Sequence, residues 1–588
     1  MREAFEQGRL MEAERLAAAR LEQLQHCLDA LVIKAACRKR QGAFSEAIPF
    51  LERAARQSRS DATVLNDLAN TYLAVGNIKS ALKTYETAIK RFPNDPYAYF
   101  NAAVTLRQQG KLQSASEMLK TTLMVQPRFV EALSESGSVA ADMGQLDFGL
   151  AQCRKALEIN PEHSAALTNF AYLSILADDP ETAISACKTV IAKDAQNADA
   201  INTLGMAYSA QKSFERSIAC FRETLRLAPD HPFAANNLGN DLLEKGEVDE
   251  ALRLYQQATV LRPTYDTAWV NRHNLELQID GAVSAIPTGA VLMERLSLTP
   301  KFQIQQAIAH FLKADDQAVK QALAQFDKAD LLGELKAMPA QDAVFCKAYA
   351  QYLAKLTNLY RPEVSGAEDP LYHVGESHCL SFAGHKLQID GAQHIVQPRI
   401  CFGLKAFHLG AAKTAKYRAL VARHLANIPS GARVLLSVGE IDCRWNDGII
   451  KAAEKRKSDL SALTRKTAQD SIAWIAQQNA RWHHDLHMIN IPAPTFFEEL
   501  TKEQNQEAAL VVRLFNTVLA ELASGHGINV IDVYSHTNNG DGFSNSIYHC
   551  DYRHLDSRIL PEIERQLNTR GCPSPYTVET GGAQNLPA

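Results

Sequence analysis

Residues 232–265 read PFAANNLGNDLLEKGEVDEALRLYQQATVLRPTY. Apolar residues recur at helical spacing on both sides of Gly246, which predicts two helices joined by a tight turn at that glycine. Ala251 and Ala258 are small where the two helices would cross. Pro263 ends the second helix, because proline cannot continue one. The stretch therefore predicts a helical hairpin.

The same pattern recurs every 34 residues through the first half of the chain. Small residues hold one phase, prolines a second and glycines a third. The three series are Ala13, Ala47, Ala81, Ala115, Gly149, Ala183, Ser217 and Ala251; Pro93, Pro127, Pro161, Pro229 and Pro263; and Gly8, Gly42, Gly76, Gly110, Gly144 and Gly246. One hairpin cannot bury its apolar face alone, so about seven of them are expected to stack into a superhelix.

The period and the pattern resemble the tetratricopeptide repeat (TPR) over residues 1–279. The resemblance implies a protein or peptide partner held along a concave face that the first helix of each hairpin lines. In the O-linked GlcNAc transferases, which the array resembles loosely, asparagines on this face hold a peptide backbone. The candidate row here is Asn66, Asn70, Asn202, Asn236 and Asn240. The alternative is that asparagine is simply tolerated near helix starts and on solvated faces.

Residues 1–20 fit the end of one helix followed by the second helix of an eighth, incomplete hairpin. Either the true start lies upstream of Met1, or the incomplete hairpin caps the array. The repeat phase is lost after residue 279, and residues 280–365 are predicted to be a linker and a helical bridge. Residues 571–588 are rich in Gly, Pro, Ser and Thr and are predicted to be disordered.

Composition narrows the function classes. The formal charge is −4 with a pI near 6.5, and there is no polybasic block, which argues against nucleic acid as a partner. We expect no membrane span and no signal peptide, because the apolar runs are short and the first residues include acids throughout. Eleven cysteines without a Cys-x-x-Cys pair favour free thiols and a cytoplasmic location.

Residues 366–570 alternate short apolar runs with helical stretches, which predicts an α/β domain with a buried parallel sheet between two layers of helices, as in flavodoxin-like folds. The expected strands are Leu371–Val374, Ile395–Ile400, Val434–Val438, His487–Ile491 and Ile528–Val533, and the expected helices are Ala411–Ala426, Leu460–Gln478 and Glu503–Ala523. Ligands of such sheets bind beyond the carboxyl ends of the strands. The segments that follow each strand are therefore the candidates for chemistry.

Those segments are Gly375-Glu376-Ser377-His378 after the first strand, Cys401-Phe402-Gly403 after the second, Gly439-Glu440-Ile441-Asp442-Cys443-Arg444 after the third, and Asp551-Tyr552-Arg553-His554 near the end. Their order resembles the SGNH (GDSL-like) hydrolases over residues 371–560. Members of that superfamily are esterases, lipases, deacetylases and O-acetyltransferases of glycans.

The resemblance implies a Ser-His-Asp triad. Ser377 would be the nucleophile, His554 its general base and Asp551 the residue that orients the imidazole. The backbone N–H groups of Ser377 and Gly403 would stabilise the oxyanion. The alternatives are a turn serine and a surface or cap histidine, and Asp551 is also a good helix cap.

Two positions depart from the family pattern. Glu376 replaces the usual aspartate before the serine, and Ile441 falls where an asparagine would donate to the oxyanion. Loss of one such donor costs roughly 100- to 1000-fold in rate. Arg444 could compensate, or the segment could bind an anionic group. The predicted substrate-binding residues are Glu376, His378, Gly439, Glu440, Asp442 and Arg444. A structural, salt-bridged loop is the alternative for residues 440–444.

Two weaker candidates complete the set. His483, His484 and His487 contain a pair at helical spacing, but the third ligand is missing, so no metal site is predicted. Cys379, Cys401 and Cys443 fall near strand ends, but a cysteine nucleophile would need a base nearer than the one Ser377 would use.

These observations lead to two main hypotheses. In the first, the repeats recruit a protein or glycoconjugate and the α/β domain removes or transfers an acyl group, most plausibly acetyl on a glycan, without a cofactor, or with an acyl donor such as acetyl-CoA if it is a transferase. In the second, the protein is a scaffold whose hydrolase-like domain only binds a ligand or partner. Glycosyl transfer is a third class, but the C-terminal half has no recognisable sugar-nucleotide pattern.

Overall fold

The computed structural model describes residues 1–57, 62–296, 300–331, 333–338, 340–358, 369–411, 415–445, 448–551 and 553–569. The chain forms two compact units, one spanning Met1–Pro229 and one beginning at Asp230. The predicted disordered segment 571–588 lies outside the described residues.

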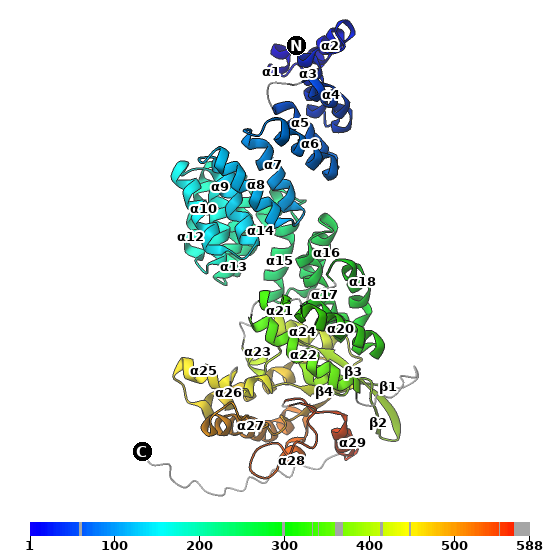
Figure 1. Ribbon diagram of the computed structural model, residues 1–588. Helices are drawn as coiled ribbons and strands as arrows, with labels where there is room; N and C mark the ends of the chain where they lie inside the picture. Colours follow the sequence, from blue (N-terminus) through cyan, green and yellow to red (C-terminus); the bar gives the residue numbers. More distant parts are fainter. Residues whose placement is uncertain are drawn as a thin grey trace. The chain divides into compact units, whose positions relative to one another are not determined.

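The described part of the first unit is built of paired helices (Figure 1). They are α1 (Arg2–Glu6), α2 (Leu10–Gln23), α3 (Leu28–Arg40), α4 (Phe44–Gln57), α5 (Thr63–Ala74), α6 (Ile78–Arg91), α7 (Pro96–Gln108), α8 (Leu112–Val125), α9 (Val130–Asp142), α10 (Leu146–Ile159), α11 (Ser164–Leu176), α12 (Pro180–Lys193), α13 (Ala198–Ala210) and α14 (Phe214–Leu227). From α3 on, each pair is one hairpin of the predicted repeat.

Small side chains allow the two helices of a hairpin to cross closely. The in-phase alanines Ala13, Ala47, Ala81, Ala115 and Ala183 are fully buried. A Cβ at Gly149 would lie 2.8 Å from the Gly137 carbonyl oxygen. The small-residue phase is therefore imposed by direct contact between the helices.

The turn between the two helices keeps the same backbone conformation in the different hairpins, even where its residue is not glycine. Gly42 and Gly76 both adopt φ of 77° there, which glycine reaches without strain. In the two hairpins that lack this glycine, Asp178 and Lys212 still adopt φ of 60° and 57°.

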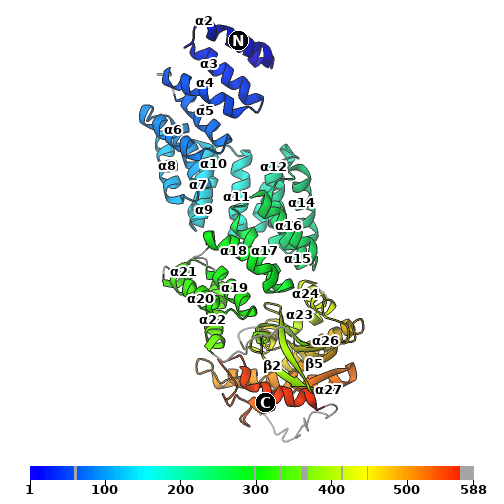
Figure 2. The same cartoon turned by 90° about the vertical axis from the view of Figure 1, so that its right-hand side faces the viewer.

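The second unit begins with further helices. They are α15 (Pro232–Glu244), α16 (Val248–Leu261), α17 (Asp266–Asp280), α18 (Ala282–Leu296), α19 (Pro300–Leu312), α20 (Asp316–Leu331), α21 (Glu334–Ala337) and α22 (Ala340–Asn358). Helices α19 to α22 correspond to the predicted helical bridge and group together in Figure 2. Their apolar core contains Ile308 and Leu353 and continues into Leu380 and Ile400 of the α/β part. Bridge and α/β part therefore share one hydrophobic core.

A six-stranded sheet follows, in the order β2-β3-β1-β4-β5-β6. The strands are β1 (Asp369–Gly375), β2 (Lys386–Ile389), β3 (Ala392–Ile400), β4 (Arg433–Ser437), β5 (Asp485–Ile489) and β6 (Ile528–Ile531). Five of them are parallel neighbours, with Gly375 of β1 opposite both Ile400 and Ser437. Without β2, the order is the 2-1-3-4-5 arrangement of flavodoxin-like sheets, whose ligands bind where the strand order reverses, here between β1 and β4.

The sheet is mixed rather than wholly parallel, which corrects the prediction. β2 pairs antiparallel with β3 through a tight turn at Asp390 and Gly391, whose φ angles are 50° and 82°. An Asp-Gly pair between short alternating runs is the standard signal of a two-residue hairpin. The four-residue strand β2 was too short to stand out from its surroundings.

Helices connect and flank the strands. They are α23 (Ala406–Gly410), α24 (Ala415–Ala426), α25 (Ile449–Arg456), α26 (Leu460–Asn479), α27 (Lys502–Ala523), α28 (Tyr534–Thr537) and α29 (Leu560–Asn568). On one face of the sheet, an apolar cluster joins Ile563 of α29 to the strand residues Leu371, Leu435 and Ile489. The intervening strand residues are equally buried, so both faces of the sheet are covered.

One helix passes a length and composition test for a membrane span, which the sequence analysis did not expect of any segment. Lys502–His526 has the length and composition to cross a membrane. Val511, Phe515 and Leu519 of this helix are buried inside the domain, and it packs beside α26 and β6. The structure thus accounts for its apolar character as that of a core helix.

The last repeat hairpin docks on the α/β part. The turn at Gly246 sits so close to α24 that a Cβ there would lie 2.9 Å from the Ala415 carbonyl oxygen. Glu244 pairs with Lys416 at 2.7 Å, and Asp249 pairs with Arg423 at 2.5 Å. Glycine is therefore favoured at position 246 for two reasons: the backbone has a positive φ, and there is no room for a Cβ atom beside Ala415.

We predict that Gly246→Ala lowers the melting temperature of the second unit more than Gly527→Ala does. Both glycines have positive φ, and the left-handed region costs an alanine about 1–2 kcal/mol. A Cβ at Gly527 meets nothing within 4 Å, whereas the Cβ at Gly246 presses on Ala415. Differential scanning calorimetry measures both variants, and equal shifts would contradict the proposed contact.

Candidate active site

Ser377, His554 and Asp551 form a continuous chain of hydrogen bonds. Ser377 opens the short helix η1 (Ser377–Leu380) directly after β1, and the other two lie in the loop before α29. Ser377 Oγ lies 2.9 Å from His554 Nε2, and His554 Nδ1 lies 2.8 Å from Asp551 Oδ2. The structure thus brings together the three residues predicted as the triad.

The electrostatic surroundings of this hydrogen-bonded series favour a neutral imidazole on His554. Burial alone would raise the pKa of Asp551, but hydrogen bonds from His554 and from backbone N–H groups hold it below its usual range. Burial also lowers the pKa of His554, and Asp551 opposes that shift only in part. Asp551 is therefore ionised at neutral pH, Nδ1 of His554 carries the proton, and Nε2 can accept one from Ser377.

Glu376 offers the serine a second acceptor. Its Oε2 atom lies 2.6 Å from Ser377 Oγ, closer than the histidine nitrogen. A serine hydroxyl has one proton to donate. The carboxylate and the imidazole therefore compete for that proton.

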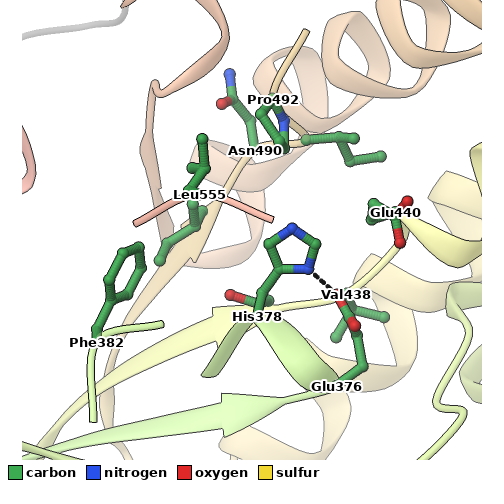
Figure 3. Close-up of a pocket in the computed structure, with 11 residues that line it drawn as sticks. Glu376, His378, Phe382, Val438, Glu440, Asn490, Pro492 and Leu555 are labelled. Carbon is green, nitrogen blue, oxygen red and sulfur yellow. Dashed lines mark hydrogen bonds and ion pairs between the residues drawn. The ribbon is translucent and has the colours of Figure 1, made fainter. Parts of the chain in front are cut away.

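His378 is held as an imidazolium ion beneath the serine. Its Nδ1 atom lies 2.5 Å from Glu376 Oε1 (Figure 3). Its Nε2 atom lies 3.1 Å from the Arg553 carbonyl oxygen. Both partners only accept hydrogen bonds, so both ring nitrogens carry protons. Burial lowers the pKa of His378, but Glu376 outweighs it and raises the pKa to about 9.

This pair continues into a buried network of alternating charge. Arg444 grips Glu440 through Nε at 2.9 Å to both carboxylate oxygens and through its terminal nitrogen. Glu376, His378, Glu440 and Arg444 therefore balance in charge. The guanidinium predicted to compensate for Ile441 is already engaged by Glu440.

Glu376, His378 and Glu440 also converge as a metal site would, with one candidate ligand atom from each within 4.8 Å of the others. A metal ligand must present a free lone pair. His378 donates from both nitrogens, and Arg444 occupies Glu440. In the structure, these three side chains form part of an ion-pair network with Arg444.

A small cavity of about 20 Å³ lies next to this network, at the carboxyl ends of β1, β4 and β5. Glu376, His378, Glu440, Asn490 and Leu555 are among its lining residues (Figure 3). It lies at the reversal of strand order, where ligands of such sheets bind. The volume has room for about one water-sized group.

Two predicted glycines shape the neighbouring turns. Gly403 adopts φ of 72°, and Gly439 adopts φ of 117° with Phe515 2.9 Å from where its Cβ would be. The Phe402 N–H, next to Gly403, donates to Gln278 Oε1 of α17 at 3.2 Å. A helix outside the α/β domain thus fixes the turn that contains Gly403.

Asp442 does not face the cavity. It is fully buried, and its oxygens accept the N–H groups of Ala406 at 2.6 Å and Phe407 at 3.0 Å. Burial raises the pKa of Asp442 to about 6, against these two hydrogen bonds. Its role in the structure is to hold the start of α23.

Tyr352 of α22 was missed by the sequence analysis. Its ring stacks on His554 with 3.9 Å between centroids. Its hydroxyl lies 3.2 Å from the Ser377 carbonyl oxygen and 2.6 Å from Ser381 Oγ, which donates to the Leu555 carbonyl oxygen. One side chain from the bridge thus contacts both Ser377 and His554.

The three neighbouring histidines do not converge. His483 lies in a turn with φ of 54°, His484 Nε2 donates to the Leu425 carbonyl oxygen at 2.9 Å, and His487 Nε2 lies 3.1 Å from Asp485. Cys379, Cys401 and Cys443 are buried. Burial raises the pKa of the Cys401 thiol to about 12, which makes it a poor nucleophile at neutral pH.

The asparagine row serves more than one purpose. Asn70 and Asn240 accept hydrogen bonds from Tyr85 and Tyr255 of the second helix in their own hairpins. Asn236 is buried and accepts from Asn271 at 2.9 Å, and Asn202 is also buried.

Asn66 and Asn70 of the row line a groove with a volume of about 790 Å³, together with Tyr97 and Asn101. Asn66 Nδ2 donates to Asp95 at 2.8 Å. Asn66 Oδ1 is buried and has no hydrogen-bond partner among the described residues. This oxygen could therefore accept a hydrogen bond from a peptide N–H group.

Comparison with known proteins identifies the repeats. Models of the tetratricopeptide repeat match residues 38–99, 72–135 and 196–263. The chain is 36% identical over 72 residues to a peroxisomal targeting signal receptor of Eremothecium gossypii, 12% of each chain. It is 26% identical over 146 residues to that of Kluyveromyces lactis, 24% of each chain. The matches thus span only a small part of these curated relatives.

Solved repeat proteins are similar to parts of the chain at low sequence identity. A tetratricopeptide repeat protein from Parabacteroides merdae is 17% identical with a TM-score of 0.38, covering 42% of this chain and 98% of its own. PilF of Pseudomonas aeruginosa is also 17% identical, with a TM-score of 0.28, covering 34% of this chain and 90% of its own. The family models show that the chain carries tetratricopeptide repeats over the matched residues.

We predict that the Glu376–His378 pair makes stability depend on pH between about 6.5 and 9. The folded pKa of His378 is raised to about 9 from an ordinary 6.5. The contribution of His378 to the free energy of unfolding is complete below pH 6.5. It is lost as the pH rises from 6.5 through 9, by up to about 1.4 kcal/mol per pH unit. Melting temperatures of the parent and of the Glu376→Gln/His378→Gln double variant measure it. If the melting temperatures of the parent and the double variant change with pH in parallel from pH 6.5 to 9, the pair does not make stability depend on pH.

Proposed function

We propose that the C-terminal unit is a serine esterase or O-acyltransferase of the SGNH type, and that the repeats recruit its substrate or partner. The carrying observation is the hydrogen-bonded chain of Ser377, His554 and Asp551 at the carboxyl edge of the sheet. A serine becomes a nucleophile when a base lies within hydrogen-bond reach and a carboxylate orients that base. Both conditions are met here.

The proposed reaction proceeds in two stages. Ser377 Oγ attacks the acyl carbon and its proton passes to His554, which then protonates the departing alcohol. Water, or an acceptor hydroxyl in a transferase, then attacks the acyl-enzyme with the same base. In a transferase, the acyl donor would be a molecule such as acetyl-CoA.

Acetyl as the acyl group rests on the SGNH resemblance. The small cavity does not select the acyl group, because no triad residue lines it. A glycan or glycoconjugate as the acyl carrier rests on the SGNH resemblance. Cytoplasmic location is part of the same proposal, since it places glycan modification before export.

The scaffold hypothesis has one structural observation in its favour. Ser377 donates to Glu376 at 2.6 Å, and Ile441 provides no side-chain donor for the oxyanion. If the serine never releases this bond, the domain binds a ligand without turning it over.

We predict that a fluorophosphonate probe labels the parent at Ser377. Ser377→Ala abolishes labelling, and His554→Ala slows it by about 100-fold or more, because general-base assistance is worth 10²–10⁴ in rate. Ser430→Ala is the matched control, since Ser430 only donates to the Trp482 carbonyl oxygen on the surface. Turnover of an acetyl ester is measured beside it. A parent that neither labels nor turns over the ester supports the scaffold.

The groove that contains Asn66 is proposed to hold an extended segment of a protein partner. A photo-crosslinking residue in place of Tyr97, which is 54% exposed and lines the groove, is expected to capture the partner in extracts of the native cell. The same residue in place of Phe148, 52% exposed and outside the groove lining, is the control. Equal capture from both positions would exclude this groove as the binding surface.

A further inference from the structure

The α/β domain lacks one donor that the proposed chemistry needs. Ile441 is apolar and 8% exposed, and the Arg444 guanidinium is engaged by Glu440. Neither side chain is free to stabilise an oxyanion on Ser377. A third donor must therefore come from another element.

Helix α22 approaches the serine from outside the α/β fold. Tyr352 places its hydroxyl 3.2 Å from the Ser377 carbonyl oxygen. Residues three apart share a helix face, so Tyr349 points to the same side one turn earlier. Its ring packs edge-on against Phe402 with 6.0 Å between centroids. Phe402 precedes Gly403, so Tyr349 lies beside the turn where the oxyanion would form.

The surroundings of the Tyr349 phenol keep it protonated. Burial raises its pKa well above 10, and the charge of Glu376 adds to that shift. The Ser377 hydroxyl and the Arg444 charge act on it in the opposite sense. The phenol therefore remains protonated and is a hydrogen-bond donor at neutral pH.

Tyr349 and Tyr352 differ in what they can reach. Tyr352 is 1% exposed, and its hydroxyl is already bonded to the Ser377 carbonyl and Ser381. Tyr349 is only partly buried. Tyr352 is thus a positioning residue, whereas Tyr349 is placed to touch a substrate.

We infer that Tyr349 donates a hydrogen bond to the oxyanion, taking the part that the asparagine plays in the SGNH pattern. When Ser377 Oγ bonds to the acyl carbon, its proton moves to His554 and the carbonyl electron pair settles on the oxygen. The Tyr349 hydroxyl stabilises that oxygen together with the N–H groups of Ser377 and Gly403. As the intermediate collapses, the C–O bond to the alcohol breaks and His554 returns the proton to it. The inference rests on the proposed esterase or transferase function.

The test compares Tyr349→Phe with the parent in full-length protein, using acetyl-ester turnover. Loss of one oxyanion donor is expected to lower kcat by about 100-fold or more, with KM changed only a few-fold. Tyr534→Phe is the matched control, because it removes a buried tyrosine hydroxyl without a hydrogen-bond partner among the described residues. Its kcat is expected to equal that of the parent.

A second variant separates chemistry from folding. Ile441→Asn in the Tyr349→Phe background restores a donor at the position that the family uses, and it is expected to recover part of the lost kcat. A Tyr349→Phe protein with kcat within about threefold of the parent overturns the inference while the proposed function stands. A loss of kcat that Ile441→Asn does not relieve, with a matching fall in melting temperature, assigns Tyr349 a structural role and also overturns it. A parent without turnover or labelling removes the proposed function itself, and this inference with it.

Discussion

The contact between Ser377 and His554 joins residues 177 positions apart, and much of the second unit is arranged around it. The sheet supplies the serine at the end of β1, and the last loop returns the histidine to the same edge. Tyr352 stacks on the histidine and holds the serine carbonyl, while Ser381 ties the Leu555 carbonyl to the same tyrosine. Burial of both partners follows, with Ser377 6% and His554 8% exposed.

The charges beneath this contact are balanced rather than merely paired. Glu376, His378, Glu440 and Arg444 bury two positive and two negative groups next to one hydroxyl. Taking charges out of water is costly, and an apolar replacement of such a network is often as stable or more so. A network of this kind beside a polar hydroxyl is therefore better explained by its electrostatic effect on that hydroxyl than by a gain in stability.

The repeats and most of the strands could be predicted from the sequence, because their signals are local. A 34-residue period, prolines after helices and apolar runs of strand length all report on nearby residues. The strand-end segments also indicated Ser377, Asp551 and His554, which the structure brings together. The four-residue strand β2 gave too little periodicity. Tyr349, Tyr352 and Gln278 could not be found, because each acts through contacts with distant segments that no local pattern encodes. Asn240 shows the reverse case: its phase suggested a ligand, but its oxygen is already used by Tyr255.

Helix α22 and the Gln278 contact bear on how such proteins diversify. The candidate site takes Tyr349 and Tyr352 from the bridge and a turn-fixing amide from α17, and the Gly246 turn is fitted against α24. The part of the chain that carries the candidate site therefore does not begin at the sheet, because it also needs α17 and α22. Recombination near residue 366 would separate the site from its supports, whereas a junction close to Pro229 would keep them together. New specificities for the array can therefore arise by gain or loss of upstream hairpins. The final hairpins and the sheet, in contrast, are expected to evolve together, because their residues contact one another.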